Sequence, residues 1–536
     1  MIHLASADGG LTTSLTAFLL VVVASFFLCL IVGTSYDTVS GFLTANRSLG
    51  ALRNGIAMCG DYISVTALLV PVGTIALAGQ DGIAFTTSTV AALIILLVLA
   101  EPVRNTGAFT LGGILTTRVP GRQVRIAAAV VTLMVCVPLT VVQLKVAGDA
   151  MTYLLGLDDA GAGQVCIVLL GLLIVSFSAF GGMSGTSMIE IAKVILAFGT
   201  FVTATAVILN RFHFDLGALL AAAAKGSGRG EDYFAPGQLY GPTATGTAER
   251  FSVALTLALG SGILPPVLMR INASRTGRTA RRSARHAVLA FAAFSLALTV
   301  LGLGAAALVG TPAIVARGGQ GYAALFLLSE SIAGGHGGGT FFTLFACAVF
   351  VTALGAVSGL TLSAAASLAH DLRTPHDGTT TRDEKQVTQT RWWLAVVGIV
   401  SVVLAVLVYR WSILFFASYA AALAASTILP ALIYALFWRG LTRNGLLATL
   451  YGGAAACMLL QVFSPTVSGS PAALFPGQDF HWFPLENVAL LSVPVGFLAG
   501  WIMSRFDRRP PAQYATPQNR MLTGKAPTSE TRGRPQ

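Results

Sequence analysis

Long apolar segments separated by short polar ones dominate the hydropathy pattern of the 536-residue chain. A helix needs about 20 mostly apolar residues to cross the hydrocarbon core of a bilayer. The first apolar segment has no Lys or Arg before it and is too long for a cleaved signal peptide, so we expect it to be retained. The pattern predicts thirteen membrane-spanning helices near residues 11–35, 50–79, 83–101, 123–155, 162–180, 187–211, 251–270, 286–310, 339–370, 391–409, 411–437, 444–462 and 487–505.

The composition supports an integral membrane protein and excludes most alternatives. Hydrophobic residues make up 55% of the chain and charged residues only 10%, whereas soluble domains carry about 25% charged residues. Most of the 33 Lys and Arg lie in alternate loops and in the tail after residue 504. By the positive-inside rule those loops are cytoplasmic, which predicts an external N-terminus and a cytoplasmic C-terminus. The net charge of +11 therefore reflects membrane orientation, and we expect no nucleic-acid partner.

Two of the predicted spans are interrupted by glycine and proline. The second contains Gly60-Asp61 and then Pro71, and the seventh contains residues 259–266 (LGSGILPP). Irregular backbone at membrane depth is tolerated only around a cavity, and paired breaks in two inverted repeats are typical of a midplane binding site in transporters. The alternative is that Gly and Pro are simply common in membrane helices. Five spans separate the two breaks, which predicts two inverted five-helix repeats.

The predicted organisation follows from these spans. An N-terminal helix and loop precede the first repeat, an external loop separates the repeats, and two further helices and a disordered basic cytoplasmic tail follow. The boundaries are 1–49, 50–211, 212–250, 251–437, 438–505 and 506–536.

Charged residues inside spans are costly at the bilayer centre and mark candidate pathways or ion pairs. Asp61 lies beside the first break, and we expect it to act as a coupling or gating carboxylate. Lys145 and Asp149 lie four residues apart and share a helical face. Lys145 either attracts a carboxylate substrate or is neutralised by Asp149.

Further polar residues lie in or near the spans. Glu190 and Lys193 are three residues apart, and we expect them to form a snorkelling pair at the lipid headgroups rather than a deep ion pair. Ser64, Gln143 and Ser261 are candidate substrate ligands, the alternative being hydroxyl groups bonded to their own helix. The chain has no dinucleotide, P-loop or HExxH motif, and its histidines and cysteines are not at metal-ligand spacing. We therefore expect no enzyme activity and no transition metal.

Several of these segments resemble the sodium/solute symporter family. Residues 44–50 (TANRSLG) resemble the stretch before the family's second helix, and residues 180–184 (FGGMS) resemble its Gly-Gly signature. Within the family, residues 60–64 (GDYIS), 264–270 (LPPVLMR) and 359–372 look like the cation/acetate permease branch. The resemblance implies thirteen helices in the inverted-repeat, APC-type fold, alternating access, and uptake of a short monocarboxylate such as acetate.

The family's sodium site implies ligands on two helices. The carbonyl groups of the broken helix fall on Gly60 and Ile63, and the oxygens of the ninth helix fall on Thr352, Gly355 and Ala356. The paired hydroxyls typical of sodium-coupled relatives are absent there. A shift of one turn offers other candidates, Ser358 and Thr361. Either the shift is real, or the sodium site is weakened, or the coupling ion is a proton.

The sequence thus predicts a cation-coupled symporter, with sodium as the family's ion, which imports a short monocarboxylate across the cytoplasmic membrane. Its partners are the carboxylate solute, sodium or a proton, and the lipid bilayer, and it needs no bound cofactor. The alternatives are a symporter for an amino acid or a sugar, a transporter-derived sensor and a passive channel. A sensor requires a cytoplasmic signalling domain, for which the polar tail is too short.

Overall fold

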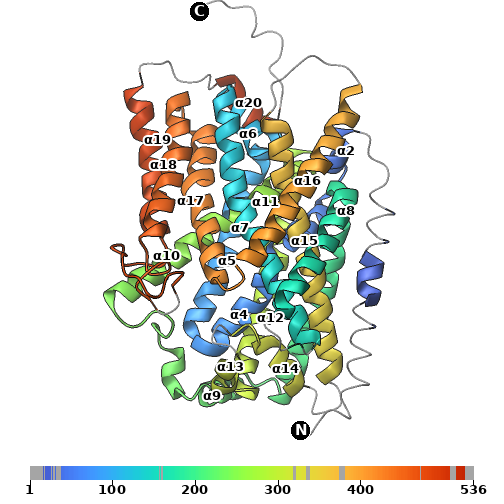
Figure 1. Cartoon of the computed structure of the whole chain (residues 1–536), viewed down its shortest axis with the longest axis vertical. Helices are drawn as coiled ribbons and strands as arrows, with labels where there is room; N and C mark the ends of the chain where they lie inside the picture. The colour runs from blue at the N-terminus through green and yellow to red at the C-terminus, as the bar shows by residue number, and fades with distance from the viewer. Residues whose placement is uncertain are drawn as a thin grey trace, which may run out of the picture.

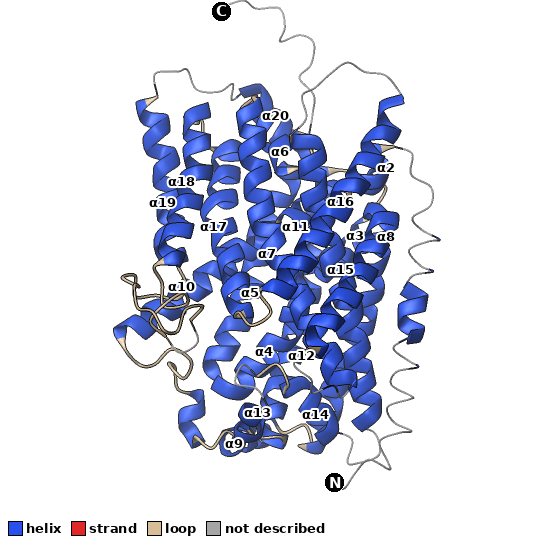
Figure 2. Cartoon of the chain, viewed as in Figure 1, coloured by secondary structure: helices blue, strands red, loops and turns tan. Residues whose placement is uncertain are grey.

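The computed structural model of this chain describes residues 16, 19–25, 27, 31, 38–155, 157, 161–317, 321–332, 338–372, 381–470, 473–507 and 515–524. The first predicted span, 11–35, lies mostly outside the described residues. The elements of the described part are helices joined by loops (Figures 1 and 2). They are α2 (Val39–Thr44), η1 (Ala45–Arg47), α3 (Ala51–Tyr62), α4 (Val65–Ala78), α5 (Gln80–Thr106), α6 (Leu111–Thr116), α7 (Arg122–Leu155), α8 (Ala162–Arg211), α9 (Leu216–Gly226), η2 (Gly230–Phe234), α10 (Ala244–Gly260), η3 (Ser261–Ile263), α11 (Pro265–Asn272), α12 (Gly277–Leu308), α13 (Thr311–Ala316), α14 (Ala324–Ile332), α15 (Gly338–Asp371), α16 (Thr381–Leu407), α17 (Ile413–Phe437), α18 (Arg443–Val462), α19 (Ala489–Phe506) and α20 (Ala515–Thr523).

The predicted spans agree closely with these helices. Within the described residues, 11 helical segments are long and apolar enough to cross a membrane, and the bent pair α3–α4 raises the number to 12. The two spans predicted at 162–180 and 187–211 form the single element α8, which is interrupted at Gly182. Gly182 adopts φ +50° and ψ −161°, a conformation that residues with a Cβ rarely adopt. The Gly-Gly signature therefore separates two spans, as the sequence pattern predicts.

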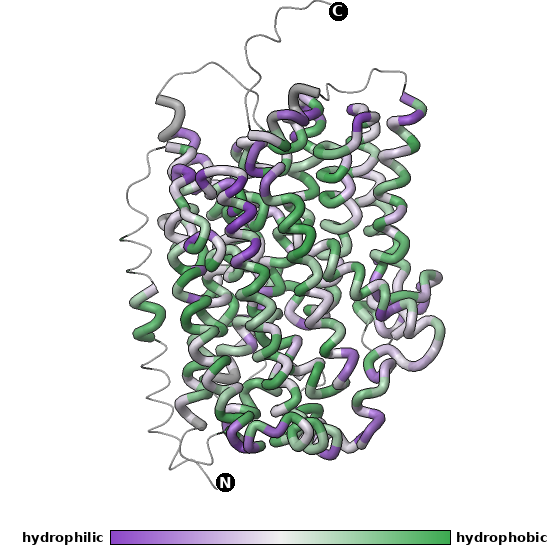
Figure 3. Tube along the Cα trace, turned by 180° about the vertical axis from the view of Figure 1, so that it is seen from behind, coloured by the Kyte–Doolittle hydropathy of each residue, from purple (hydrophilic) through white to green (hydrophobic). Residues whose placement is uncertain are grey.

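The loops predicted to be cytoplasmic meet at one end of the bundle. Arginine side chains of these loops donate hydrogen bonds to backbone carbonyl groups of other loops. These bonds hold loops that are distant in sequence side by side. These hydrogen bonds run from Arg47 to Gly107, from Arg104 to Ser274 and Arg275, from Arg118 to Arg439, and from Arg275 to Ser48. Hydrophilic segments gather at both ends of the bundle, and hydrophobic ones fill the region between them (Figure 3). We call the arginine-rich end the basic end.

The two broken spans run antiparallel. The start of α3 lies at the basic end together with the end of α11, because Leu49 forms a β-bridge with Ser274. The far end of α4 lies at the opposite end, where Tyr233 of η2 donates a hydrogen bond to the Ile75 carbonyl. One broken span therefore leaves the basic end and the other approaches it. This is the arrangement that an inverted repeat requires.

Part of the C-terminal tail is helical, which differs from the predicted disorder. Helix α20 packs against α5, and the Asn105 side chain donates a hydrogen bond of 2.8 Å to the Met521 carbonyl. Met521 is 2% exposed. Helix α20 therefore buries a short apolar face, although the tail as a whole is polar and basic. The mean hydropathy of the whole tail is too low to predict such a short apolar face.

Candidate substrate and cation sites

The first break lies between α3 and α4, which are bent by 58° relative to each other. Ser64 caps α4, since its hydroxyl accepts a hydrogen bond of 3.1 Å from the Ala67 amide. The same hydroxyl lies 2.8 Å from the Thr66 hydroxyl. On α7, Gln143 accepts a hydrogen bond of 2.9 Å from the Val65 amide. Side chains therefore satisfy the amides freed at this helix N-terminus.

The second break lies between α10 and α11, and η3 fills it. Pro265 and Pro266 occupy the first positions of α11, where a missing amide hydrogen costs nothing. Ser261 donates a hydrogen bond of 2.6 Å to the Leu257 carbonyl of its own helix. The Tyr62 hydroxyl donates a hydrogen bond of 3.3 Å to the Gly262 carbonyl, so the two breaks lie against each other.

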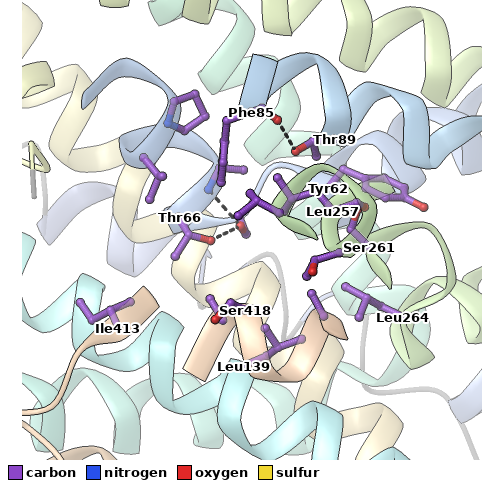
Figure 4. Close-up of a pocket in the computed structure, with 18 of the residues that line it drawn as sticks. Tyr62, Thr66, Phe85, Thr89, Leu139, Leu257, Ser261, Leu264, Ile413 and Ser418 are labelled. Atoms are coloured by element: carbon purple, nitrogen blue, oxygen red, sulfur yellow. Dashed lines mark hydrogen bonds between the residues drawn. The ribbon is translucent and has the colours of Figure 1, made fainter. Parts of the chain in front are cut away.

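A central cavity of about 430 Å³ lies between the two breaks. Figure 4 shows Phe85 and Thr89 of α5 on one side of this space, and Leu139 and Ser418 on the opposite side. The cavity reaches from Asp61 at the break of α3–α4 to loop residues of the end opposite the basic end. Its polar lining residues are Asp61, Tyr62, Ser64, Thr66, Thr86, Thr89, Gln143, Tyr240, Thr256, Ser261, Ser412, Ser418, Thr466, Ser470, Glu486 and Asn487.

The charges at the cavity are acidic only. Asp61 and Glu486 are the ionisable carboxylates among the described lining residues, and that lining includes no Lys, Arg or His. The neutral part of the lining combines hydroxyl and amide groups with apolar side chains. An anion in this cavity would therefore depend on helix N-termini and hydroxyl groups for its neutralisation.

The basic end of the cavity is closed by an ion pair. The Arg270 guanidinium on α11 contacts the Asp61 carboxylate on α3 through two hydrogen bonds, Nε to Oδ2 at 2.5 Å and Nη2 to Oδ1 at 3.0 Å. Its Nη1 donates to the Ser187 hydroxyl on α8 at 2.8 Å. The side chains of Arg270 and Asp61 are 2% and 4% exposed. This fork ties together the basic-end halves of both broken spans.

Glu190 and Lys193 form a second ion pair, and it is fully buried. The expectation that they snorkel to the headgroups is wrong, because their side chains are 0% and 1% exposed. The Glu190 carboxylate lies between Gly60 and Gly355. A Cβ on Gly60 would lie 2.3 Å from Glu190 Oε2, and a Cβ on Gly355 would lie 2.5 Å from Oε1. Two glycines thus make room for this carboxylate.

Helix α15 carries Thr352, Gly355 and Gly359 on one face, because they are spaced by three and four residues. A Cβ on Gly355 would meet Glu190 and Lys193 of α8, and a Cβ on Gly359 would lie 3.7 Å from Pro266 of α11 and 4.0 Å from Asp61 of α3. The Thr352 hydroxyl is buried without a hydrogen-bond partner. The register counted without a gap therefore contains one buried hydroxyl group that has no hydrogen-bond partner among the described residues.

The residues of the shifted register have other partners. Ser358 accepts a hydrogen bond of 2.6 Å from Ser178 on α8. Thr361 donates to the Val357 carbonyl of its own helix at 2.7 Å. Both hydroxyl groups of the shifted register therefore have hydrogen-bond partners within or beside their own helix.

On the broken helix, the Gly60 carbonyl accepts a hydrogen bond of 3.0 Å from the Ile63 amide.

Lys145 lies outside the cavity lining. Its ammonium group donates to the Trp411 carbonyl and lies 5.6 Å from the centre of the Tyr409 ring. Asp149 accepts a hydrogen bond of 3.1 Å from the Tyr409 hydroxyl. The two residues share Tyr409 as a neighbour, and neither has a hydrogen bond to the other in the described part of the chain.

Arg270 is the residue whose role sequence reasoning missed. In the sequence Arg270 stands at the start of an arginine-rich loop, where a solvated cytoplasmic cation is expected, whereas the structure buries its side chain. The sequence feature that indicates burial of Arg270 is its position within the half-helix that begins at Pro265 and ends at Asn272. A cation inside a broken span needs a carboxylate partner, and Asp61 was the nearest candidate at the matching break.

The chain matches the model of the sodium:solute symporter family over residues 42–453. It belongs to this family. The chain is 35% identical over 502 residues to a protein named monocarboxylic acid transporter from Corynebacterium glutamicum, which covers 91% of this chain and 90% of the relative. It is 32% identical over 495 residues to an uncharacterized symporter of Bacillus subtilis (strain 168), covering 91% and 93%.

Two solved structures share the fold of this symporter family member. A Na⁺-coupled sialic acid symporter in a substrate-bound, outward-open state has a TM-score of 0.72 at 14% identity, covering 94% of this chain and 99% of that chain. Mhp1, a nucleobase-cation-symport-1 family transporter, has a TM-score of 0.56 at 12% identity, covering 86% and 92%. The family match makes the protein a multi-pass membrane transporter and not an enzyme, and its all-helical fold matches these two transporter structures.

Proposed function

We propose that this protein imports a short monocarboxylate, such as acetate, by symport with a cation, either sodium or a proton. The observation that carries the proposal is the cavity between two antiparallel broken spans, closed at the basic end by Asp61 and Arg270. Binding in the cavity would favour opening of that ion pair, and the substrate would leave toward the basic end. The 35% identical monocarboxylic acid transporter supports the choice of substrate.

The carboxylate group would bind near the N-terminus of α4. Ser64 and Thr66 present hydroxyl groups there, and Gln143 orients the first turn through the Val65 amide. The positive end of a helix dipole favours an anion, and half-helix N-termini face anionic groups in other transporters. The apolar walls, among them Phe85 and Leu139, would contact a short alkyl chain. Ser261 lies across the cavity as a second hydroxyl ligand.

Asp61 would couple substrate binding to gate opening. It lines the cavity and also holds Arg270, so it is in contact with both the substrate space and the closed end. A cation entering with the monocarboxylate neutralises the added negative charge beside Asp61. Symport therefore suits an acidic cavity that has no basic lining residue in the described part of the chain.

The test is uptake of labelled acetate into vesicles containing the purified protein, under an inward sodium gradient or an inward proton gradient. Acetic acid crosses bilayers in its neutral form, so protein-free vesicles under the same gradients are the matched control. We expect saturable accumulation above that control under at least one gradient. Uptake indifferent to both gradients would contradict symport.

A competition panel then tests the substrate class. Unlabelled propionate and pyruvate should inhibit acetate uptake, because they share the carboxylate and a short apolar body. Alanine and glucose should not inhibit, since each brings polar groups that would replace contacts with the apolar walls. Inhibition by alanine or glucose, with no effect of pyruvate, would favour an amino-acid or sugar symporter instead.

A further inference from the structure

Four charged side chains form one buried cluster beside the first break. Asp61 of α3, Arg270 of α11, and Glu190 and Lys193 of α8 are at most 4% exposed. The two carboxylates and two cations sum to zero charge. We call these four residues the charge cluster. Because an unpaired charge in a protein interior is very costly, its neutrality is a condition for burying it.

Beside the charge cluster, the groups on the broken helix, on α8 and on α15 include oxygen atoms of the kinds that bind a cation. The Glu190 carboxylate lies against Gly60 on one side and Gly355 on the other. The Thr352 hydroxyl is buried without a partner on the same face of α15. The Ile63 carbonyl accepts no hydrogen bond in the described part of the chain. An anionic carboxylate and neutral oxygen atoms are the ligands that a hard cation prefers.

The cation paired with Glu190 belongs to the protein itself. Lys193 Nζ pairs with Glu190, and a Cβ on Gly355 would lie 3.2 Å from Nζ. Apart from its pairing with Glu190, Nζ has no hydrogen-bond partner among the described residues. The ammonium group is thus directed to the place that the missing side chain of Gly355 leaves open.

We propose that the Lys193 ammonium group is a built-in cation that occupies the position beside Glu190 and Gly355, so that this position does not take up sodium. A sodium ion added beside a charged Lys193 would give the charge cluster a net charge of +1 in a dry interior. Sodium and the ammonium group are therefore alternative partners of Glu190.

This proposal deepens the proposed function, because it states which cation can occupy one position of the transporter. The transport assay below rests on the proposed function. The thermal unfolding assay does not rest on it. Thermal unfolding of the purified protein is followed in sodium chloride and in choline chloride of equal ionic strength. Any ion that binds only the folded state raises the unfolding temperature, whatever the transported solute is.

The decisive variant is Lys193→Ala, which leaves the charge cluster with a net charge of −1 and opens space beside Glu190. We expect no sodium-specific rise in the unfolding temperature of the wild type, and a rise of several degrees in Lys193→Ala. Acetate uptake by Lys193→Ala should fall at least ten-fold in choline and recover at least five-fold in sodium. Wild-type uptake should be the same in both salts.

Two further variants keep the result interpretable. Glu190→Gln combined with Lys193→Met removes both charges at similar volume, so it should fold and show no sodium-specific stabilisation. Lys225→Ala removes an exposed lysine of α9 and should behave as the wild type in every assay. A sodium-specific stabilisation of the wild type that Lys193→Ala abolishes, or a Lys193→Ala protein that folds without any response to sodium, would overturn the proposal.

Discussion

Two ion pairs within the charge cluster have opposite environments. Asp61 and Arg270 join two different helices, and the guanidinium donates to both carboxylate oxygens and to Ser187. Glu190 and Lys193 lie one turn apart on α8 and, beyond each other, have no hydrogen-bond partner for their charged atoms in the described residues.

The difference separates a gate from a binding position. A pair that bridges α3 and α11 loses its contact when those half-helices separate, so it can hold the basic end closed. A pair within one helix cannot hold two elements together. The Glu190–Lys193 pair instead places its charges between neighbouring helices, and the Glu190 carboxylate lies between Gly60 of α3 and Gly355 of α15. Substitutions in the two pairs should therefore have different consequences.

The largest effect is expected for Asp61→Asn. Removing one partner of a buried ion pair costs about 3–5 kcal/mol of free energy. A free-energy change of that size lowers an equilibrium constant or a rate by about 100-fold or more. We expect the rate of acetate uptake to fall by that factor. Retained uptake in Asp61→Asn would remove this residue from the coupling role.

The matched control for this prediction is the neutral double variant, Asp61→Asn with Arg270→Gln. It leaves no buried unpaired charge, so its unfolding temperature should return close to that of the wild type. Its accumulation of acetate should stay low, because the gate no longer depends on an ion pair. Full recovery of accumulation would make the pair a purely structural feature.

A smaller effect is expected for Gly355→Ala, which introduces a methyl group 2.5 Å from Glu190 Oε1. Overpacking of a buried site costs about 1–3 kcal/mol, and we expect uptake to fall by about ten-fold. The control is Gly199→Ala on α8, where a Cβ would meet nothing within 4 Å. Equal uptake by the two variants would show that the space beside Glu190 is not needed for transport.

The proposed substrate position predicts a more moderate effect for Ser64→Ala. Loss of a helix N-cap costs about 1 kcal/mol, and the substrate also loses a hydroxyl partner, so KM for acetate should rise by about five-fold. The serine control is Ser88→Ala on α5, since Ser88 donates to the Ala84 carbonyl of its own helix. An unchanged KM in Ser64→Ala would place the carboxylate elsewhere in the cavity.

The smallest effect concerns the other end of the cavity, where Glu486 lies. The surrounding loops partly remove its carboxyl group from water, and this desolvation raises the pKa of Glu486 above the usual range of a glutamate. Since the carboxyl group gains its proton as the pH falls through this raised pKa, acidification removes a negative charge from the path of an anionic substrate. KM for acetate should therefore fall as the pH decreases from 8 toward 5.5.

Glu486→Gln removes this dependence. At pH 8 its KM should be about two- to five-fold lower than that of the wild type, the factor that about 0.5–1 kcal/mol produces, and its KM should vary less with pH. The sign follows from the raised pKa, because the unfavourable charge is present at high pH and lost at low pH. A parallel pH dependence in both proteins would mean that another group titrates.

Hydropathy and glycine–proline patterns predicted most of the fold because they are local properties of the chain. The spans from residue 50 to residue 505 and both breaks lie where the pattern placed them. The Arg-rich loops meet at one end, as their alternation requires. Helix α20 was missed because its packing on α5 depends on a contact between residues far apart in sequence.

The site was less predictable because its chemistry arises between helices. The sequence singles out Asp61, Ser64, Gln143 and Ser261 as candidates because each lies in or near a break, and all four line the cavity. The resemblance to the family implied paired hydroxyls on the ninth helix, and the sequence does not have them at Gly355 and Ala356. That Lys193 of α8 is directed toward Gly355 could not be known without the packing of α8 against α15.

The most direct test of the central claim is protection of the cavity by substrate. Thr89→Cys places a thiol on the cavity wall, and a membrane-impermeant thiol reagent is added from the side opposite the basic end, with the wild type as the control for native cysteines. We predict that acetate slows modification of Cys at this position in a concentration-dependent manner, and that glucose does not. Modification at the same rate with and without saturating acetate would contradict a monocarboxylate site between the two broken spans.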